Sequence, residues 1–254
     1  MIIKKLVVKI GTQCSLRCEK CGEFNPYLKK KFTLTAKNML QDIYPILQSV
    51  EMIEIVHIAG GEPFLHKDLS EFLCCLATFP QVGKIEIVTN GTIIPEEITF
   101  CILKNLKEKI IVLISDYSGA GVDNGALISS LEENGINHKV NKDMVWKDKS
   151  DISFKNYTAE DLNDIAKNCS TFRKDYFSLI NGIITAHCPT AGSLLYYKDL
   201  YDNMADFFFN VRETDIKEIS KKLEKLNDFS YTPMCNYCVP TNKAKNCIAG
   251  EQIK

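Results

Sequence analysis

CSLRCEKC, at residues 14–21, brings three cysteines into eight positions directly after a short apolar run at residues 6–10. Three thiols in this spacing fit a disulfide network, a zinc site that lacks a ligand, or three ligands of a centre that keeps one position open. Soft sulfur ligands favour zinc or an iron–sulfur cluster. A structural zinc site takes four ligands, but after Cys21 the next cysteine or histidine is His57, which favours a three-ligand site with an open position.

The composition is that of an ordinary globular protein. The chain has 254 residues, of which 45% are hydrophobic and 25% are charged, and its formal net charge is −1. This charge gives no general attraction to nucleic acid or acidic lipid, and no apolar stretch has the length of a membrane helix. We therefore expect a soluble, cytoplasmic protein with neither partner. Eleven cysteines in that reducing compartment favour metal ligation over disulfides.

The first half of the chain alternates between β-rich runs and helical patterns. The runs lie at 6–10, 52–59, 84–90 and 109–115, with a weaker one at 136–140. The segments between them carry apolar residues three and four positions apart, as amphipathic helices do. This βαβα series predicts a parallel sheet covered by helices, with a ligand site in the loops that follow the strands.

The pattern changes after Trp146. The run FSLINGIITAHC at 177–188 predicts a β-hairpin that turns at its Asn-Gly pair, and residues 213–227 predict a helix before a cysteine-rich tail. We place a domain boundary near residue 150, which divides the chain into 1–150 and 151–254.

A GGEP sequence at 60–63 follows the second predicted strand, one βα unit after the three cysteines. Together these motifs resemble the radical S-adenosylmethionine (SAM) superfamily. The resemblance implies an α/β fold with a full or partial (β/α)6 barrel, here a partial one. It also implies a [4Fe-4S] cluster whose fourth iron is chelated by SAM and whose other irons are held by Cys14, Cys18 and Cys21.

The resemblance implies further contacts with SAM. Gly60, Gly61 and Glu62 match the family motif that meets the SAM amino group. Asn90 and Ser115, which end the next two strands, match positions that contact the ribose and the carboxylate. Lys20 departs from the family pattern, in which the position before the last cysteine is often aromatic and packs on adenine.

A second set of cysteines lies in the C-terminal half: Cys169, Cys188, Cys235 and Cys238. Their arrangement resembles the twitch domain, a small β-hairpin-plus-helix module that holds an auxiliary [4Fe-4S] cluster, and is similar in spacing to a dehydrogenase that oxidises 2-deoxy-scyllo-inosamine. By ligand type alone a four-cysteine zinc site is equally open. Cys247 is an alternative to one of the four ligands. The cysteines on predicted helices, at 74, 75 and 101, are expected to be buried and inert.

The resemblance implies reductive cleavage of SAM to a 5′-deoxyadenosyl radical that removes hydrogen from a substrate. An auxiliary cluster with four protein ligands suits electron transfer, so we expect a dehydrogenase-like oxidoreductase. The segments ISDYSG, HCPTAG and the tail from Cys235 resemble radical SAM proteins of sugar and polysaccharide biosynthesis, which implies a sugar, aminocyclitol or nucleotide-sugar substrate. A flavodoxin or ferredoxin-type protein is the expected reductant.

Three alternatives remain open: a peptide-modifying enzyme that forms crosslinks or epimerises residues, a redox-neutral sugar epimerase, and a non-catalytic metal-binding module. Tyr117, Trp146 and His187 are expected to face the substrate, and the sequence identifies no catalytic base. The chain has only three arginines, which disfavours a highly phosphorylated substrate.

Overall fold

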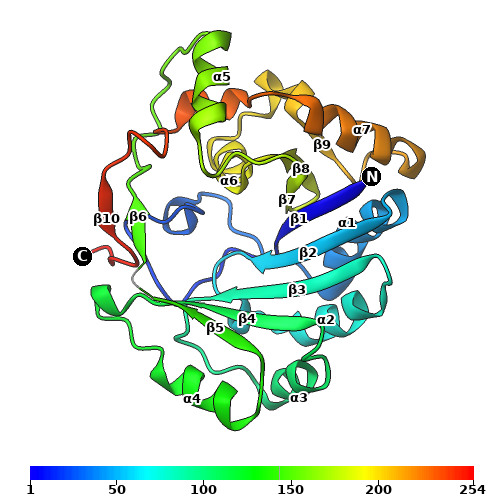
Figure 1. Ribbon diagram of the computed structural model, residues 1–254, viewed down its shortest axis with the longest axis vertical. Helices are drawn as coiled ribbons and strands as arrows, with labels where there is room; N and C mark the ends of the chain where they lie inside the picture. The colour runs from blue at the N-terminus through cyan, green and yellow to red at the C-terminus, as the bar shows by residue number, and fades with distance from the viewer. Residues whose placement is uncertain (143) are drawn as a thin grey trace.

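The fold is built on one central sheet of eight strands. The computed structural model describes residues 1–142 and 144–254, and Figure 1 shows its sheet curving through the molecule. The strand order is β5-β4-β3-β2-β1-β7-β8-β9. Five strands run parallel to their neighbours, namely β1 (Ile2–Lys9), β2 (Met52–Ala59), β3 (Val82–Thr89), β4 (Ile110–Ser115) and β5 (His138–Asn141). The predicted α/β fold with a parallel sheet is confirmed.

Four helices connect these strands and lie along the outer face of the sheet (Figure 1). They are α1 (Ala36–Ser49), α2 (Leu69–Thr78), α3 (Glu97–Asn105) and α4 (Gly125–Glu133). The α1 helix begins at Thr35, whose hydroxyl accepts a hydrogen bond from the backbone N–H of Asn38. Its buried residues Met39, Ile43 and Ile46 recur three and four positions apart, so one face packs on the sheet.

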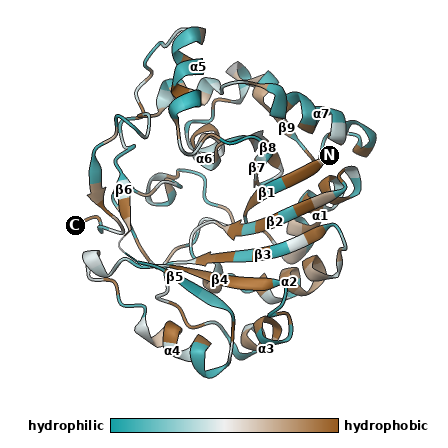
Figure 2. Ribbon diagram, in the orientation of Figure 1, coloured by the Kyte–Doolittle hydropathy of each residue, from teal (hydrophilic) through white to brown (hydrophobic). Residues whose placement is uncertain are grey.

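The core lies between this helical layer and the strands. Figure 2 shows apolar residues concentrated along the strands and on the helix faces that meet them. In β2, Ile53, Val56 and Ile58 are fully buried. Fixed in this core, the strands bring their carboxyl-terminal loops together at one rim.

The predicted hairpin forms where the sequence places it. Its strands are β7 (Tyr176–Ile180) and β8 (Ile183–Ala186), and the turn residues Asn181 and Gly182 both have positive φ. β7 pairs in parallel with β1, and β9 (Phe208–Asn210) pairs with β8. The hairpin therefore extends the central sheet beyond β1.

Three more helices follow β5. The α6 helix (Pro189–Lys198) packs against β7 and β8, while α7 (Ile216–Asp228) packs beside α1 and confirms the helix predicted at 213–227. The α5 helix (Ala159–Asn168) stands at one end of the molecule (Figure 1). Short 3-10 helices are η1 (Asn25–Tyr27), η2 (Pro63–Leu65), η3 (Ser118–Ala120), η4 (Tyr201–Asn203), η5 (Ala205–Phe207) and η6 (Pro233–Tyr237).

A small second sheet pairs β6 (Val145–Lys147) with β10 (Asn246–Ile248) in antiparallel fashion. It brings the end of the chain back to the rim of the central sheet, opposite the N-terminus (Figure 1). Within the described ranges, every helix falls short of the length or the apolar character needed to cross a membrane.

Candidate functional site

The loop after β1 carries the three predicted cluster ligands and packs against the GGEP loop after β2. The backbone N–H of Gly61 donates to the carbonyl of Gly11 at 3.0 Å, and that of Glu62 donates to the carbonyl of Gln13 at 2.7 Å. A Cβ on Gly61 would overlap the Gln13 carbonyl oxygen, and one on Gly60 would overlap that of Gly11. The two glycines are therefore needed for the close approach of the two loops.

Glu62 is buried at the junction of these loops. Its carboxylate accepts hydrogen bonds from the Thr89 hydroxyl at 2.7 Å, the Phe64 N–H at 3.0 Å and the Asn90 N–H at 2.9 Å. Burial raises the pKa of Glu62, and the three hydrogen bonds oppose that shift. The motif residue thus ties the end of β3 to the GGEP loop, and its oxygens have lone pairs left for a further donor.

Asn90 connects the end of β3 to the cysteine loop. Its amide nitrogen lies 3.7 Å from the sulfur of Cys14 and 3.0 Å from the hydroxyl of Ser15, while its oxygen accepts from Thr92. Ser115 is buried at the end of β4, the next strand in the sheet. The GGEP loop and Asn90 therefore contact the cysteine-loop region, and the contacts of these residues and of Ser115 with SAM stay a prediction.

The three thiols have the chemistry that an iron–sulfur cluster requires. All eleven cysteines of the chain are free thiols. Burial raises the pKa of Cys14, Cys18 and Cys21, that of Cys21 to about 11. Buried thiols of this kind ionise when a cation binds them. Amide N–H groups of Asn90 and Gln252 point at the sulfurs of Cys14 and Cys18, and such donors commonly surround cluster ligands.

The three thiols of this loop match the predicted cluster in ligand type and in ligand number. Among residues 1–142 and 144–254, no three Cys, His, Asp or Glu side chains lie in positions that would hold one metal ion. Side-chain N–H donors lie at Cys14 and Cys18, as they commonly do around cluster ligands.

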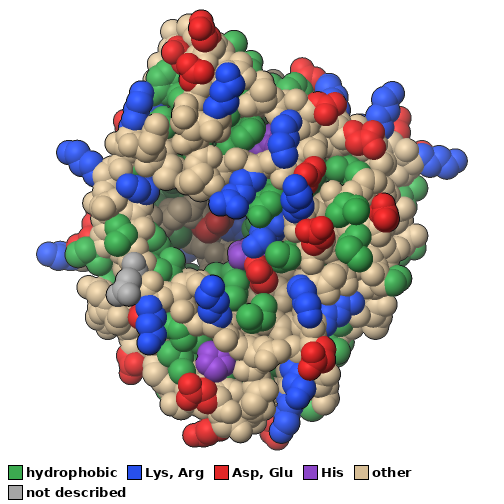
Figure 3. Space-filling view, in the orientation of Figure 1, with side chains coloured by type: hydrophobic (Ala, Val, Ile, Leu, Met, Phe, Trp, Pro, Cys, Tyr) green, Lys and Arg blue, Asp and Glu red, His purple; other side chains and the backbone are tan. Residues whose placement is uncertain are grey.

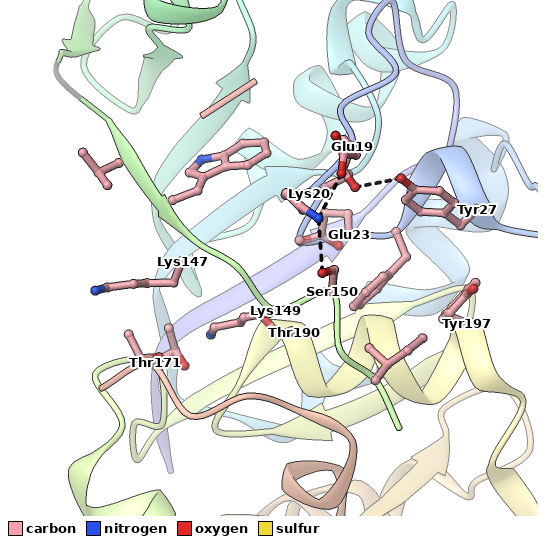
Figure 4. A pocket seen from close by; sticks show the side chains of 17 residues that line it. Glu19, Lys20, Glu23, Tyr27, Lys147, Lys149, Ser150, Thr171, Thr190 and Tyr197 are labelled. Carbon is pink, nitrogen blue, oxygen red and sulfur yellow. Dashed lines mark hydrogen bonds and ion pairs between the residues drawn. The ribbon is translucent and has the colours of Figure 1, made fainter. Parts of the chain in front are cut away.

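Lys20 links the cysteine loop to the segment after β6. Its ammonium group lies 2.9 Å from a carboxylate oxygen of Glu19, 3.6 Å from one of Asp148 and 3.4 Å from the hydroxyl of Ser150. Hydrogen bonding to Glu19 raises the pKa of Lys20, so the side chain stays charged. The departure from an aromatic residue thus has a local structural role, seen in Figure 4.

The second set of four cysteines comes together around one small apolar cavity. Cys169 follows α5, Cys188 precedes α6, and Cys235 and Cys238 lie in and directly after η6. All four line the same cavity, with Phe172, Leu194 and Met234 among its apolar walls. Four thiols from three separate segments therefore border one cavity, although no three of them, among the described residues, lie in positions that would hold a single metal ion.

The ionisation of these thiols depends on their neighbours. Burial, together with the thiols of Cys188 and Cys238, raises the pKa of Cys235 to about 12, and burial raises that of Cys238 to about 11. Burial also favours the neutral form of Cys169, but hydrogen bonds from Thr171 and Thr241 outweigh it and lower the pKa to about 7. Cys169 is thus nearer to thiolate at neutral pH than Cys235 or Cys238.

Cys247 lies outside the cavity that the four cysteines line. It is in β10, opposite Trp146 of β6, and the charged groups that influence it are Asp148, Lys20, Glu251 and Glu19. It is not among the residues that line the cavity of the four cysteines. This position gives no support to Cys247 as a replacement for one of the four.

A cavity of about 580 Å³ lies between the two cysteine sets. One wall is formed by the cysteine loop, including Cys21 and Glu23, and the other includes Thr171 and Thr241, whose hydroxyls contact the sulfur of Cys169 at 3.0 and 3.5 Å. Figure 3 shows a hollow with charged side chains in and around it. The polar residues labelled in Figure 4 include Lys147, Lys149, Ser150, Thr171 and Thr190.

The three residues expected to face the substrate have different positions. Trp146 lines the cavity, and its ring meets that of Tyr117 edge-on with the centroids 5.3 Å apart. Burial raises the pKa of Tyr117, which lies behind Trp146 and near the first three thiols. His187 is buried against Phe172, with its Nδ1 3.2 Å from the Arg173 carbonyl oxygen, and is not among the residues that line the large cavity.

Sequence reasoning missed two groups of residues at this site. One is the pair Thr171 and Thr241, which separates the cavity from Cys169. The other is the C-terminal segment 250–253, which pairs with the cysteine loop through Cys18 and Gln252. The segment CIAGEQ carries only a resemblance, and no periodicity in it predicts a strand that returns to residue 18.

Comparisons with known proteins support the same fold. No model of a known protein family matches the chain. Two curated relatives are GTP 3′,8-cyclases: one from Clostridium acetobutylicum is 30% identical over 96 residues, covering 37% of this chain and 29% of that protein, and one from Aquifex aeolicus is 30% identical over 109 residues, covering 42% and 32%. The matched region thus spans about a third or less of these relatives.

Two solved structures match over nearly the whole chain. BtrN in complex with AdoMet and 2-DOIA has a TM-score of 0.59 at 16% identity, covering 94% of this chain and 93% of that one. Native anSMEcpe with bound AdoMet has a TM-score of 0.51 at 14% identity, covering 94% and 89%. At this identity the likeness shows the fold. The local sequence similarity to the cyclases is what supports the radical SAM superfamily.

Proposed function

We propose that this radical SAM fold carries an oxidoreductase that oxidises a sugar, aminocyclitol or nucleotide-sugar by two electrons. Cys14, Cys18 and Cys21 would hold a SAM-binding [4Fe-4S] cluster, and Cys169, Cys188, Cys235 and Cys238 an auxiliary one. When bound, the first cluster and SAM supply the 5′-deoxyadenosyl radical, which takes one hydrogen atom from the substrate. To complete the oxidation the substrate would have to lose a proton and a second electron, and a cluster held by Cys169, Cys188, Cys235 and Cys238 would be the electron acceptor.

The observation that carries this proposal is the position of the large cavity. A substrate in it would lie beside Cys21 and Gly22 on one wall and beside Thr171 and Thr241 on the other. Because Thr171 and Thr241 contact the sulfur of Cys169 directly, only one layer of side chains separates the cavity from the second cysteine set. A short path of this kind suits the transfer of an electron from substrate to an auxiliary cluster.

The lining combines polar groups with a larger apolar and aromatic surface, which suits a ring that carries hydroxyl groups. Hydroxyl groups come from Ser150, Thr171, Thr190 and Thr241, and amino groups come from Lys20, Lys147 and Lys149. Trp146, Phe24 and Tyr197 add aromatic surface, on which the apolar face of a sugar or aminocyclitol ring can rest. The whole-chain likeness to BtrN, whose structure holds 2-DOIA, is consistent with this choice.

The part of the chain's own residues in the reaction would be to position the loops beside the cavity. The backbone N–H of Glu62 bonds the GGEP loop to Gln13 beside the cysteine loop, the Asn90 amide lies at Cys14, and Lys20 on the cavity wall bonds Ser150. A reactive radical requires a site closed to water. These contacts hold the cysteine loop in place beside the cavity.

The test is a count of clusters combined with product analysis. Anaerobically reconstituted chain should bind about eight irons, and a C14A/C18A/C21A variant about four. Under dithionite, only the wild type should produce 5′-deoxyadenosine. A C235A/C238A variant serves as the matched control, because it should still cleave SAM but should not release oxidised product from an aminocyclitol such as 2-DOIA or from a nucleotide-sugar panel.

Other results would point to the alternatives. About four irons in the wild type, with zinc retained in both it and the triple variant, would remove the electron acceptor and favour a redox-neutral epimerase. Turnover of a peptide in place of the sugar panel would favour a peptide-modifying enzyme. Absence of 5′-deoxyadenosine from protein with a full first cluster would refute the enzymatic proposal.

A further inference from the structure

The C-terminal segment 250–253 runs antiparallel to the cysteine loop. The N–H of Glu19 donates to the carbonyl of Glu251 at 2.7 Å, and the N–H of Ile253 donates to the carbonyl of Arg17 at 2.8 Å. An isolated β-bridge pairs Cys18 with Gln252 between these two bonds. The segment thus covers the middle of the CSLRCEKC stretch with a short piece of strand.

Gln252 makes two side-chain contacts with the loop that it covers. Its Oε1 accepts a hydrogen bond from the backbone N–H of Arg17 at 2.7 Å, and its Nε2 donates to the sulfur of Cys18 at 3.4 Å. Cys18 is only 7% exposed. The side chain of Gln252 is therefore oriented at one end by the loop backbone, so that its N–H group points at a ligand sulfur.

The segment is held in place from its other side by aromatic residues. Gly250 has a φ of +78°, and a Cβ at this position would lie 2.5 Å from Cγ of Tyr117. Tyr117 in turn packs on Trp146, which pairs with Cys247 of β10. Gly250 thus permits a close approach that fixes the register of Gln252 over Cys18.

We infer that segment 250–253 is an integral part of the first cysteine site, and that Gln252 is a positioning residue that donates a hydrogen bond to the Cys18 sulfur when a cluster is bound. The inference rests on the proposed cluster at Cys14, Cys18 and Cys21. An N–H donor stabilises negative charge on a ligand sulfur, so it favours the reduced cluster and raises the reduction potential. The paired backbone also restricts the approach of solvent to Cys18.

Tyr117 and Trp146 acquire a second role in this arrangement. Trp146 presents one part of its surface to the cavity, and the Tyr117–Trp146 pair supports Gly250. The proposed substrate site is therefore connected to the segment over Cys18 by direct contacts, from Trp146 to Tyr117 and from Tyr117 to Gly250. Tyr117 acts in this geometry as a support for the segment.

The experiment compares Gln252→Leu and Gln252→Glu with wild type in the full, reconstituted chain. Gln252→Glu keeps the length and the acceptor for Arg17 but loses the N–H donor to the Cys18 sulfur and to the Gly250 carbonyl. Lys254→Gln, at an exposed position next to the segment, is the matched control. The readouts are iron content, the midpoint potential of the cluster whose electron paramagnetic resonance signal responds to SAM, and the rate of iron release to a chelator.

Both Gln252 variants should shift that potential to more negative values, and iron release should become about three- to tenfold faster, as the loss of one hydrogen bond predicts. Lys254→Gln should behave as wild type. Wild-type potential and release rate in a folded Gln252→Glu variant would overturn the inference. Failure of the proposed cluster would look different, because the wild type itself would then show no SAM-responsive signal.

Discussion

The hydroxyl of Thr171 lies 3.0 Å from the sulfur of Cys169, and the same residue lines the large cavity. It also lies 3.8 Å from the sulfur of Cys188. One side chain therefore contacts two thiols of the second set and faces the space proposed for the substrate. A residue in this position can influence both the charge on an auxiliary cluster and the path into it.

Replacing Thr171 by Val removes the hydroxyl and keeps the shape. We expect unchanged iron content, a more negative potential for the proposed auxiliary cluster and slower oxidation of the proposed substrate, because a hydrogen bond to sulfur stabilises the reduced cluster. Redox titration monitored by electron paramagnetic resonance measures the shift. Thr171→Ser retains the hydroxyl and should restore the wild-type potential; equal potentials in the Val and Ser variants would contradict the prediction.

A buried ion pair beneath the cysteine loop leads to a second prediction. The ammonium group of Lys9, only 2% exposed, lies 3.2 Å from a carboxylate oxygen of Glu23, which also accepts a hydrogen bond from Ser193 at 2.5 Å. Glu23 is 30% exposed and lines the cavity. Lys9 is therefore less hydrated than Glu23. Replacing Lys9 and replacing Glu23 should lower the free energy of unfolding by different amounts.

Glu23→Gln should lower the free energy of unfolding by about 3 kcal/mol, because it leaves the Lys9 charge buried without its counter-ion. Lys9→Met should lower it less, since the Glu23 carboxylate that remains can be hydrated from the cavity. The double variant should recover part of the loss, as a double-mutant cycle in urea would measure. A larger loss for Lys9→Met than for Glu23→Gln would show that this assignment of the buried charge is wrong.

The sequence predicts the individual strands better than the order in which they pair. The runs at 52–59 and 109–115 match β2 (Met52–Ala59) and β4 (Ile110–Ser115) almost residue for residue, because buried parallel strands are continuous apolar runs. The hairpin was also predicted from its Asn-Gly turn. Nothing local to the hairpin indicates that β7 pairs with β1, since that pairing joins segments about 170 residues apart.

The helical cysteines show a limit of composition-based reasoning. Cys74 and Cys101 are exposed and Cys75 is half-buried, so the expectation that all three are buried is wrong. In α2 the buried positions are Leu69, Phe72, Leu73 and Leu76. These residues fill the face that meets the sheet, and the helical period turns Cys74 toward solvent.

The sequence likewise predicts only some residues of the candidate site. Local spacing predicts the first cysteine set, and a resemblance to the twitch domain indicates the second, which the structure brings around one cavity. Thr171 and Gln252 were not predicted, because each is positioned by partners distant in sequence: Gln252 and Cys18 are 234 residues apart. Contacts of this kind depend on the assembled sheet and leave no period or motif in the sequence.

A third prediction concerns pH. Glu86 on β3 lies 2.6 Å from His57 on β2 and 2.9 Å from Lys5 on β1. Burial alone would raise the pKa of Glu86, but hydrogen bonds from His57 and Lys5 and their charges outweigh it and hold the pKa at about 2. A lowered carboxyl pKa stabilises the fold above the unfolded value of 4.5, and this stabilisation is lost as pH falls toward 2.

Glu86→Gln should therefore lower the free energy of unfolding at pH 7, by about 2 kcal/mol for a partly buried charged pair. The difference from wild type should shrink steadily between pH 4.5 and pH 2. Denaturant titrations of reduced, metal-free wild type and variant measure it, so that acid loss of clusters affects neither. A difference that stays constant down to pH 2.5 would contradict the lowered pKa of Glu86.

The contact between the GGEP loop and the cysteine loop leads to the last prediction. Gly61→Ala would place a methyl group on the Gln13 carbonyl oxygen, next to the backbone of Cys14. Because the obstacle is backbone, the two loops must separate, and the hydrogen bond from Glu62 N–H to the Gln13 carbonyl would be lost.

Gly22→Ala is the matched control in the same cysteine loop, since a Cβ there meets no atom of the described residues within 4 Å. We expect Gly61→Ala to lose SAM binding and most iron from the first site while the second site keeps its metal, and Gly22→Ala to retain both. Iron analysis and equilibrium dialysis with SAM would measure this, and full SAM binding by Gly61→Ala would show that the close packing of the two loops is not what forms the site.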